Sequence, residues 1–76
     1  MSLPLEWLHC GEWAEVAEVT GEPSWVSRLA ELGIRVGCRL QMLRAGSPCL
    51  VLIEGCRLSL RGDALAQILV QPLAAV

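Results

Sequence analysis

His9 and Cys10 are adjacent in the sequence, and both are side chains that commonly bind transition metals. In an extended chain, neighbouring side chains point to opposite faces, so these two would not easily hold one ion together. They are weak metal-site candidates, at which we expect adventitious zinc or another divalent metal before a functional ion. The sequence has no cluster of His, Asp, Glu or Cys suited to selective binding of a transition metal, and we expect no required cofactor.

The four cysteines do not form the motif of a structural zinc site. Such sites usually take two ligands from one tight turn, but no C-x-x-C pair occurs among Cys10, Cys38, Cys49 and Cys56. In a cytoplasmic chain we expect these cysteines to be reduced and to act as small apolar side chains, most of them buried. A disulfide scaffold is the alternative.

The sequence also lacks the residue sets of common catalytic mechanisms. His9, the only histidine, has no Ser or Asp partner at a recognisable spacing. There is no G-x-x-x-x-G-K-[ST] loop to hold phosphates, and without lysine no Schiff base can form. The sequence therefore predicts a protein that is not an enzyme.

The length and composition favour one small domain over residues 1–76. A chain of 76 residues has room for one hydrophobic core. Because apolar residues make up 54% of the sequence, an apolar docking surface can remain after the core is built. No segment reaches the ~20 apolar residues of a membrane span, and the chain does not begin with a secretory signal, so a cytoplasmic location is expected.

Charge is distributed unevenly along the sequence. The net charge of −2 argues against general nucleic-acid binding. Five glutamates lie between Glu6 and Glu22, whereas all six basic residues are arginines between Arg28 and Arg61. These charges either fold back into weak exposed pairs, or form an acidic and a basic side that would orient a protein partner.

Glycine and proline divide the chain into segments of about five to ten residues, which is typical of the short strands of a small barrel. Three segments predict a strand meander: residues 39–44, 49–53 and 56–61. Glu54 and Gly55 would form the two-residue turn of its second hairpin. Alternation along the last strand predicts that Cys56, Leu58 and Leu60 face inward.

A short helix is predicted over residues 24–32. Ser24 can cap its free backbone N–H groups, and Gly33 can adopt the left-handed conformation that ends it. The expected buried face consists of Val26, Leu29, Ala30 and Leu32. A shorter helical turn is predicted at residues 63–68, before a closing strand at residues 68–71.

Residues 12–19 allow two predictions. Glutamates three residues apart favour a helix, whereas Val16, Val19 and the bounding Gly11 and Gly21 allow a strand. Periodicity alone favours the helix.

Residues 28–37, with the sequence R-L-A-E-L-G-I-R-V-G, resemble a signature of FeoA domains. The L-S-L-R of residues 58–61 and the I-L-V-Q-P of residues 68–72 resemble the ending of the same family. The resemblance covers nearly the whole chain. It implies a mainly β, SH3-like barrel of about five strands with one inserted short helix, and it implies that residues 13–19 form a strand.

The resemblance also has functional implications. FeoA proteins are described as cytoplasmic accessories of FeoB, the bacterial membrane transporter of ferrous iron, and no enzymatic activity comes with the family. It therefore implies a non-enzymatic accessory protein that binds and regulates a FeoB-type transporter. Similar domains form the C-terminal domain of some metal-dependent repressors. The alternative is therefore a metal-sensing or metal-binding domain.

Trp25, Arg28 and Arg35 are the predicted partner-binding residues. Trp25 lies in the first turn of the predicted helix and is the tryptophan expected to be half exposed, with the two arginines close by. Tryptophan and arginine are enriched at the centres of protein interfaces. The alternative is that Trp25 closes one end of the barrel while the arginines pair with Glu22 and Glu31.

Overall fold

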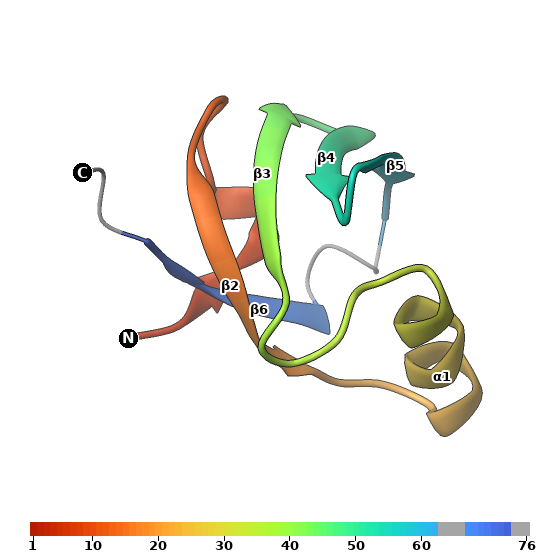
Figure 1. Ribbon diagram of the computed structural model, residues 1–76. Coiled ribbons are helices and arrows are strands. Elements are labelled where there is room, and N and C mark those ends of the chain that lie inside the picture. Colours follow the sequence, from red (N-terminus) through yellow and green to blue (C-terminus); the bar gives the residue numbers. More distant parts are fainter. Residues whose placement is uncertain (63–66, 74–76) are drawn as a thin grey trace.

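The computed structural model describes residues 1–62 and 67–73. Its elements, in chain order, are β1 (Leu3–Pro4), the 3-10 helix η1 (Leu5–Trp7), β2 (Trp13–Val19), α1 (Pro23–Glu31), β3 (Arg39–Arg44), β4 (Cys49–Ile53), β5 (Cys56–Leu60) and β6 (Ile68–Pro72). The strands form one antiparallel sheet in the order β1-β6-β2-β3-β4-β5. The sheet is strongly curved, and α1 lies at one end of it (Figure 1).

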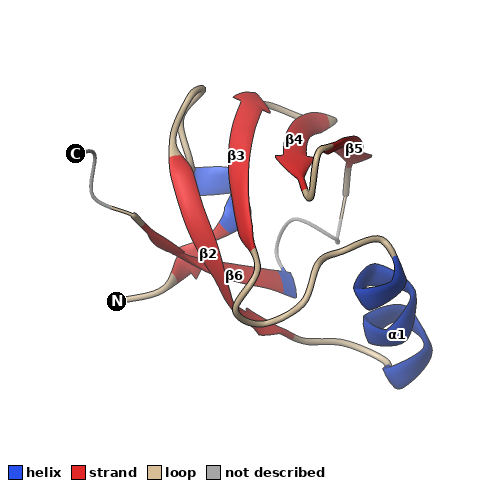
Figure 2. Ribbon diagram, in the orientation of Figure 1, coloured by secondary structure: helices blue, strands red, loops and turns tan. Residues whose placement is uncertain are grey.

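The hydrophobic core lies inside the curve of the sheet, and η1 lies behind β2 and β3 (Figure 2). Alternate residues of each strand point into the core, because neighbouring side chains of a strand face opposite sides. The fully buried strand residues include Ala14, Val16, Leu40, Met42, Val51, Ile53, Ile68 and Val70. Leu5 of η1 and Leu29 of α1 complete this core, so the sheet and both helices are packed together.

The predicted mainly β fold with one inserted helix is confirmed. The strands predicted at residues 39–44 and 49–53 have the observed bounds of β3 and β4, and β2 is the strand that the family resemblance implied. The structure adds β1, which pairs with β6, and the sheet is open between its end strands β1 and β5. The helical turn predicted at residues 63–68 falls mostly on residues 63–66, outside the described part of the chain.

Helix α1 begins one residue earlier than predicted, because Pro23 occupies its first position. The fixed φ of proline suits the helix, and this position needs no backbone N–H. Glu22 is the N-cap residue and makes no side-chain capping bond, while Ser24 lies inside the first turn, so the predicted cap by Ser24 is wrong. Gly33 has a φ of +102° and follows the helix, as predicted.

The predicted buried face of α1 is only partly correct. Leu29 is buried, Val26 and Ala30 are partly buried, and Leu32 is 47% exposed. Leu32 is the C-cap residue, where the chain leaves the helix on its way to β3, so its side chain is off the buried stripe. Within residues 1–62 and 67–73, no helix has both the length and the apolar sequence that a membrane span needs.

The turn between β4 and β5 has the predicted two-residue form. Glu54 and Gly55 have φ angles of 50° and 78°, and positive φ at both central residues is what a type I′ hairpin turn requires. Register places Cys56, Leu58 and Leu60 opposite the buried Ile53, Val51 and Cys49, as predicted, but Leu60 is buried, Leu58 partly buried and Cys56 exposed. Cys56 is the first residue of β5, an end strand of the sheet, so few side chains cover it.

The cysteines are less buried than predicted. All four are free thiols, but only Cys49 is buried, Cys38 is partly buried, and Cys10 and Cys56 are exposed. Cys10 lies in the loop before β2, and neither exposed thiol is at a position that the core covers. The disulfide scaffold kept as an alternative is therefore wrong.

Candidate partner-binding surface

A salt bridge holds the loop between α1 and β3 against the β4–β5 turn. Nη2 of Arg35 lies 3.0 Å from Oε1 of Glu54, and this hydrogen bond raises the pKa of the guanidinium. The Cys38 thiol lies 3.7 Å from the same carboxylate oxygen. A Cβ atom at Gly33 would lie 3.4 Å from Glu54 Oε2. The loop therefore runs close to the Glu54 side chain along much of its length.

Exposed apolar side chains lie on both sides of Arg35 in the sequence. Leu32 is 47% exposed and Val36 is 67% exposed, and Arg28, one helical turn before Leu32, is exposed as well. We call Arg28, Leu32, Arg35 and Val36 the helix–loop surface. Exposed apolar groups beside arginine are the chemistry expected of a docking site rather than of an ordinary solvated face.

Trp25, the predicted aromatic anchor, is partly buried and packs against the core. Its Cδ1 atom would lie 3.1 Å from a Cβ atom at Gly21, in the turn before the helix. Its indole Nε1 is buried and has no hydrogen-bond partner among the described residues. Trp7 and Trp13 are the exposed tryptophans, at 67% and 46%. Trp25 thus fixes α1 against the sheet, and the two predicted arginines are the exposed members of the predicted site.

The alternative pairing of the predicted arginines is wrong for the described residues. These residues contain two ion pairs, Arg35–Glu54 and His9–Glu12, and neither involves Glu22 or Glu31. The carboxylate that pairs with Arg35 comes from a turn distant in sequence, which local spacing could not indicate. The exposed Arg28 side chain makes no ion pair within residues 1–62 and 67–73.

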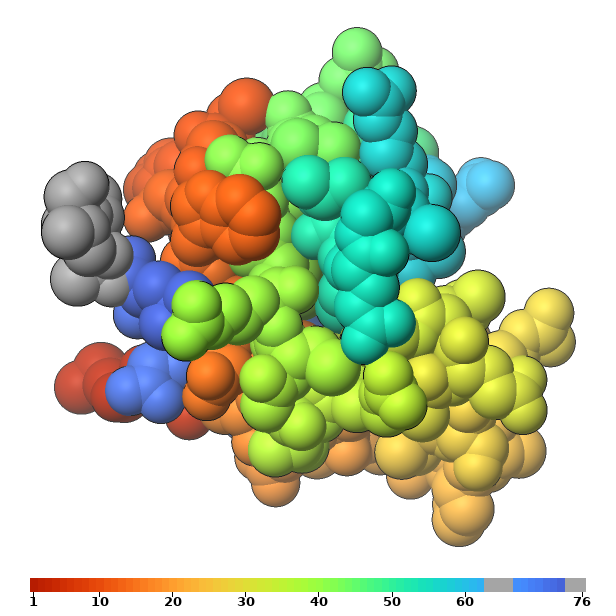
Figure 3. Space-filling view, in the orientation of Figure 1, coloured from red at the N-terminus to blue at the C-terminus, as the bar shows by residue number. Residues whose placement is uncertain are grey.

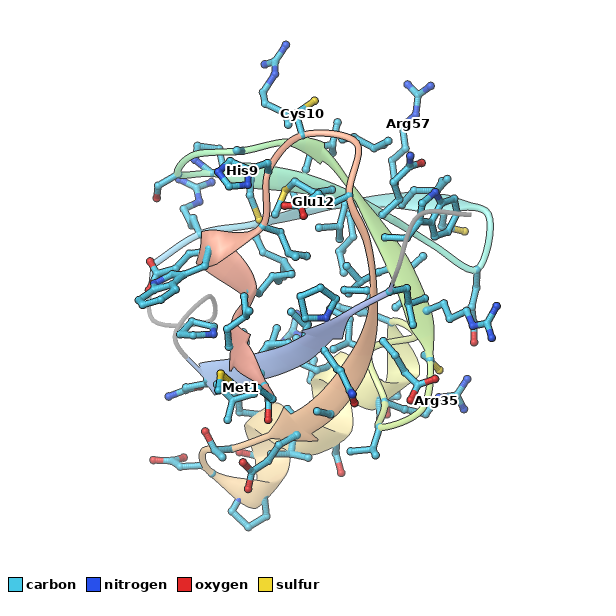
Figure 4. The ribbon with its side chains drawn as sticks, turned by 90° about the vertical axis from the view of Figure 1, so that its left-hand side faces the viewer. Met1, His9, Cys10, Glu12, Arg35 and Arg57 are labelled. Atoms are coloured by element: carbon cyan, nitrogen blue, oxygen red, sulfur yellow. The ribbon has the colours of Figure 1, made fainter. Side chains whose placement is uncertain are left out.

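His9 and Cys10, labelled with Glu12 in Figure 4, have separate partners. Nδ1 of His9 lies 3.0 Å from Oε1 of Glu12, and the backbone N–H of His9 donates to the same oxygen, which lowers the pKa of Glu12. The Cys10 thiol instead donates to the carbonyl oxygen of Leu43 at 3.0 Å. Among the residues described, no three His, Cys, Asp or Glu side chains are grouped to hold a metal ion. The structure therefore places the Glu12 carboxylate against His9 at this weak candidate site, without a third ligand among the described residues.

A row of side chains on the outer face of the sheet was not predicted. Strand register places Trp13 opposite Gln41, Gln41 opposite Leu52, and Leu52 opposite Arg57, one residue from each of four neighbouring strands. We call these four residues the outer row. Ala14 after Trp13 is buried, and so are both sequence neighbours of Gln41 and of Leu52, so the row faces away from the core. Atoms of β2, β3 and the β4–β5 hairpin form one continuous surface on this face (Figure 3).

The family model described as FeoA domain matches residues 3–72. Among solved structures, the chain is similar to the FeoA protein of Chlorobium tepidum, with 36% identity over 95% of this chain and 71% of that one, and a TM-score of 0.86. No curated protein sequence matches the chain.

Two further solved structures share the fold. FeoA of Stenotrophomonas maltophilia complexed with zinc is 26% identical over 91% of this chain and 89% of that one, with a TM-score of 0.78. That protein is described as a procaryotic SH3 domain protein and a candidate activating factor of bacterial ferrous iron transport. A manganese-dependent transcriptional repressor in complex with manganese is 25% identical over 95% of this chain and 37% of that one, with a TM-score of 0.86.

Proposed function

The chain belongs to the FeoA domain family, and from this premise we propose that it is a non-enzymatic accessory protein of ferrous iron uptake. Its partner is the cytoplasmic part of a FeoB-type transporter, which it binds and regulates from the cytoplasm. Support comes from the match of the family model to residues 3–72 and from the likeness to proteins described as FeoA.

This proposal rests on the helix–loop surface. Leu32 and Val36 expose apolar area that the core does not use, and Arg28 and Arg35 lie beside them. A partner that covered this surface would remove the apolar area from water and would place carboxylates against the guanidinium groups. Trp25 supports the surface from the core side, where it holds α1 in place.

Regulation by such a protein requires no catalytic group. A bound partner shifts a two-state transporter only by the difference between its affinities for the two states. The salt bridge between Arg35 and Glu54 joins the loop to the β4–β5 turn, and a loop ordered by it would present a preformed surface to one transporter state. A rigid surface loses less entropy on binding than a loop that must first become ordered.

The test is a binding titration with the purified cytoplasmic domain of the FeoB-type transporter from the same organism. We expect Leu32→Ser combined with Val36→Ser to weaken binding by at least ~10-fold, because loss of an interface anchor costs more than 1 kcal/mol. Trp7→Ser is the matched control, since it removes an exposed apolar side chain from η1, outside the helix–loop surface. Equal binding by the double variant and by wild type would contradict the proposal, provided that both are folded.

A metal-responsive module is the second candidate function, and the likeness to the manganese-dependent repressor favours it. Its test is thermal unfolding with manganese or zinc and then with excess chelator. A Tm increase at one equivalent of metal that is lost in the His9→Ala, Cys10→Ser variant would support this function. Identical melting curves in metal and in chelator would exclude it.

A further inference from the structure

The outer row combines apolar and cationic side chains across four strands. Trp13 is 46% exposed at one end of the row, and Arg57 is exposed at the other. Gln41 and Leu52 lie between them and are partly buried. The Gln41 amide donates a hydrogen bond of 3.1 Å to the carbonyl oxygen of Gly11, which fixes its side chain beside the indole. The row is therefore an ordered surface with an aromatic group and a cation at its two ends.

The charges next to the row are unequal. Arg39 and Glu15 occupy the neighbouring cross-strand pair, two residues along β3 and β2 from Gln41 and Trp13. Neither Arg39 nor Arg57 makes an ion pair with any residue in the described ranges 1–62 and 67–73. The row and this neighbouring pair together therefore offer two guanidinium groups, Arg39 and Arg57, and one carboxylate, Glu15. Guanidinium groups bind carboxylates in a planar, bidentate geometry that a lysine cannot provide.

The outer row and the helix–loop surface face the same side of the molecule. In Figure 4 the labelled Arg57 and Arg35 both lie in the right-hand half, Arg57 at the top pointing upward and Arg35 lower down pointing outward, whereas Met1 and His9 lie on the left. Glu54, the partner of Arg35, lies two residues beyond Leu52 at the end of the same hairpin. One partner can therefore contact both surfaces without passing around the molecule.

We propose that the outer row binds an acidic segment of the partner protein, with an apolar side chain of that segment on Trp13 and Leu52 and a carboxylate on Arg57. This inference rests on the proposed function and assigns a second part of the same interface. The unpaired guanidinium groups select an acidic segment, because a basic segment would be repelled by both of them. A nucleic acid is disfavoured by the net charge of −2 and by Glu15 beside Trp13.

The first experiment uses Trp13 as the reporter. In a variant with Trp7→Phe and Trp25→Phe, Trp13 is the only tryptophan, so its fluorescence reports on the outer row alone. Addition of the transporter's cytoplasmic domain carrying Trp→Phe substitutions should shift its emission to the blue and reduce quenching by acrylamide. Unchanged emission and quenching, in a mixture shown by sedimentation to be bound, would overturn the inference and leave the proposed function intact. Failure of wild type to bind that domain would overturn both.

The second experiment measures affinity. Trp13→Ser and Arg57→Glu should each weaken binding by at least ~10-fold, and Arg57→Glu should also flatten the salt dependence of the Kd. Trp7→Ser and Arg61→Glu are the matched controls, with the same substitutions outside the row, and should bind like wild type. If Arg57→Glu fails to fold, Arg57→Gln is used in its place, and if Trp13→Ser fails to fold, Trp13→Gln is used. The inference would be overturned if both row variants bound with wild-type affinity. It would also be overturned if sedimentation showed a wild-type homodimer that the row variants abolish, because the row would then be the contact between two copies of this chain.

Discussion

The guanidinium group of Arg35 and the carboxylate of Glu54 lie 3.0 Å apart and connect the loop after α1 to the turn between β4 and β5. Both side chains are more than half exposed, so solvent screens the pair. The contact therefore orders the loop more than it stabilises the fold. This distinction can be measured, because loop order and global stability have different readouts.

The first prediction concerns this pair. Glu54→Gln keeps the size of the side chain and removes its charge, so we expect a small change in Tm but faster amide hydrogen exchange in residues 33–38. High salt should bring the exchange of the wild-type loop towards that of the variant, because it screens the pair. Exchange rates that are the same in both proteins at low salt would show that the salt bridge does not order the loop.

The second prediction separates the two roles considered for Trp25. Trp25→Phe keeps most of the packing and removes a buried N–H that has no partner among the described residues, so the free energy of unfolding should stay within ~1 kcal/mol of wild type. Trp25→Ala should lower it by about 2–4 kcal/mol, because it leaves space between α1 and the core. Urea unfolding measures both values. An alanine variant as stable as wild type would mean that Trp25 is not a packing residue.

The third prediction concerns pH. The backbone N–H of His9 is the main cause of the lowered pKa of Glu12, so ionised Glu12 stabilises the folded state above its unfolded pKa. This contribution disappears as the pH falls through the lowered folded-state pKa. Glu12→Gln should therefore have a lower Tm than wild type at pH 7, and the two melting temperatures should converge in acid. A Tm difference that does not change with pH would exclude an effect of charge.

The fourth prediction concerns the thiols. Burial raises the pKa of Cys49, so this thiol should stay protonated and react with iodoacetamide only when the protein unfolds. Cys10 and Cys56 are exposed and should be modified in the native protein. Mass spectrometry of peptides after a short reaction checks the order. Early modification of Cys49 would show that β4 opens on its own.

Local signals were enough to predict β3, β4 and the turn that follows β4. Both strands consist of apolar and alternating residues bounded by Gly or Pro, and Glu54-Gly55 matches a turn that needs positive φ at both positions. β2 could not be predicted from residues alone, because its glutamates have helical spacing. β1 has two residues and owes its strand conformation to β6, so no local pattern could indicate it.

The tryptophans show why the candidate site could be predicted only in part. Whether Trp13 faces the core or solvent depends on strand register, and a shift of one residue would exchange the two faces. The exposure of Trp25 depends on packing against residues of the core that are far from it in sequence. The exposure of Arg28 and Arg35 could be predicted without register or packing, because burial of an unpaired charge is costly wherever it occurs.

β6 lies between β1 and β2 in the sheet, and Val70 is opposite both Leu3 and Val16. A ribosome makes the chain from the N-terminus, so β1 and β2 emerge well before the strand that joins them. The sheet cannot be completed on the ribosome until residue 72 has left the exit tunnel, and the apolar faces of the early strands remain uncovered until then. Nascent chains stalled before Ile68 should therefore be held by chaperones, whereas chains released after Pro72 should fold without them.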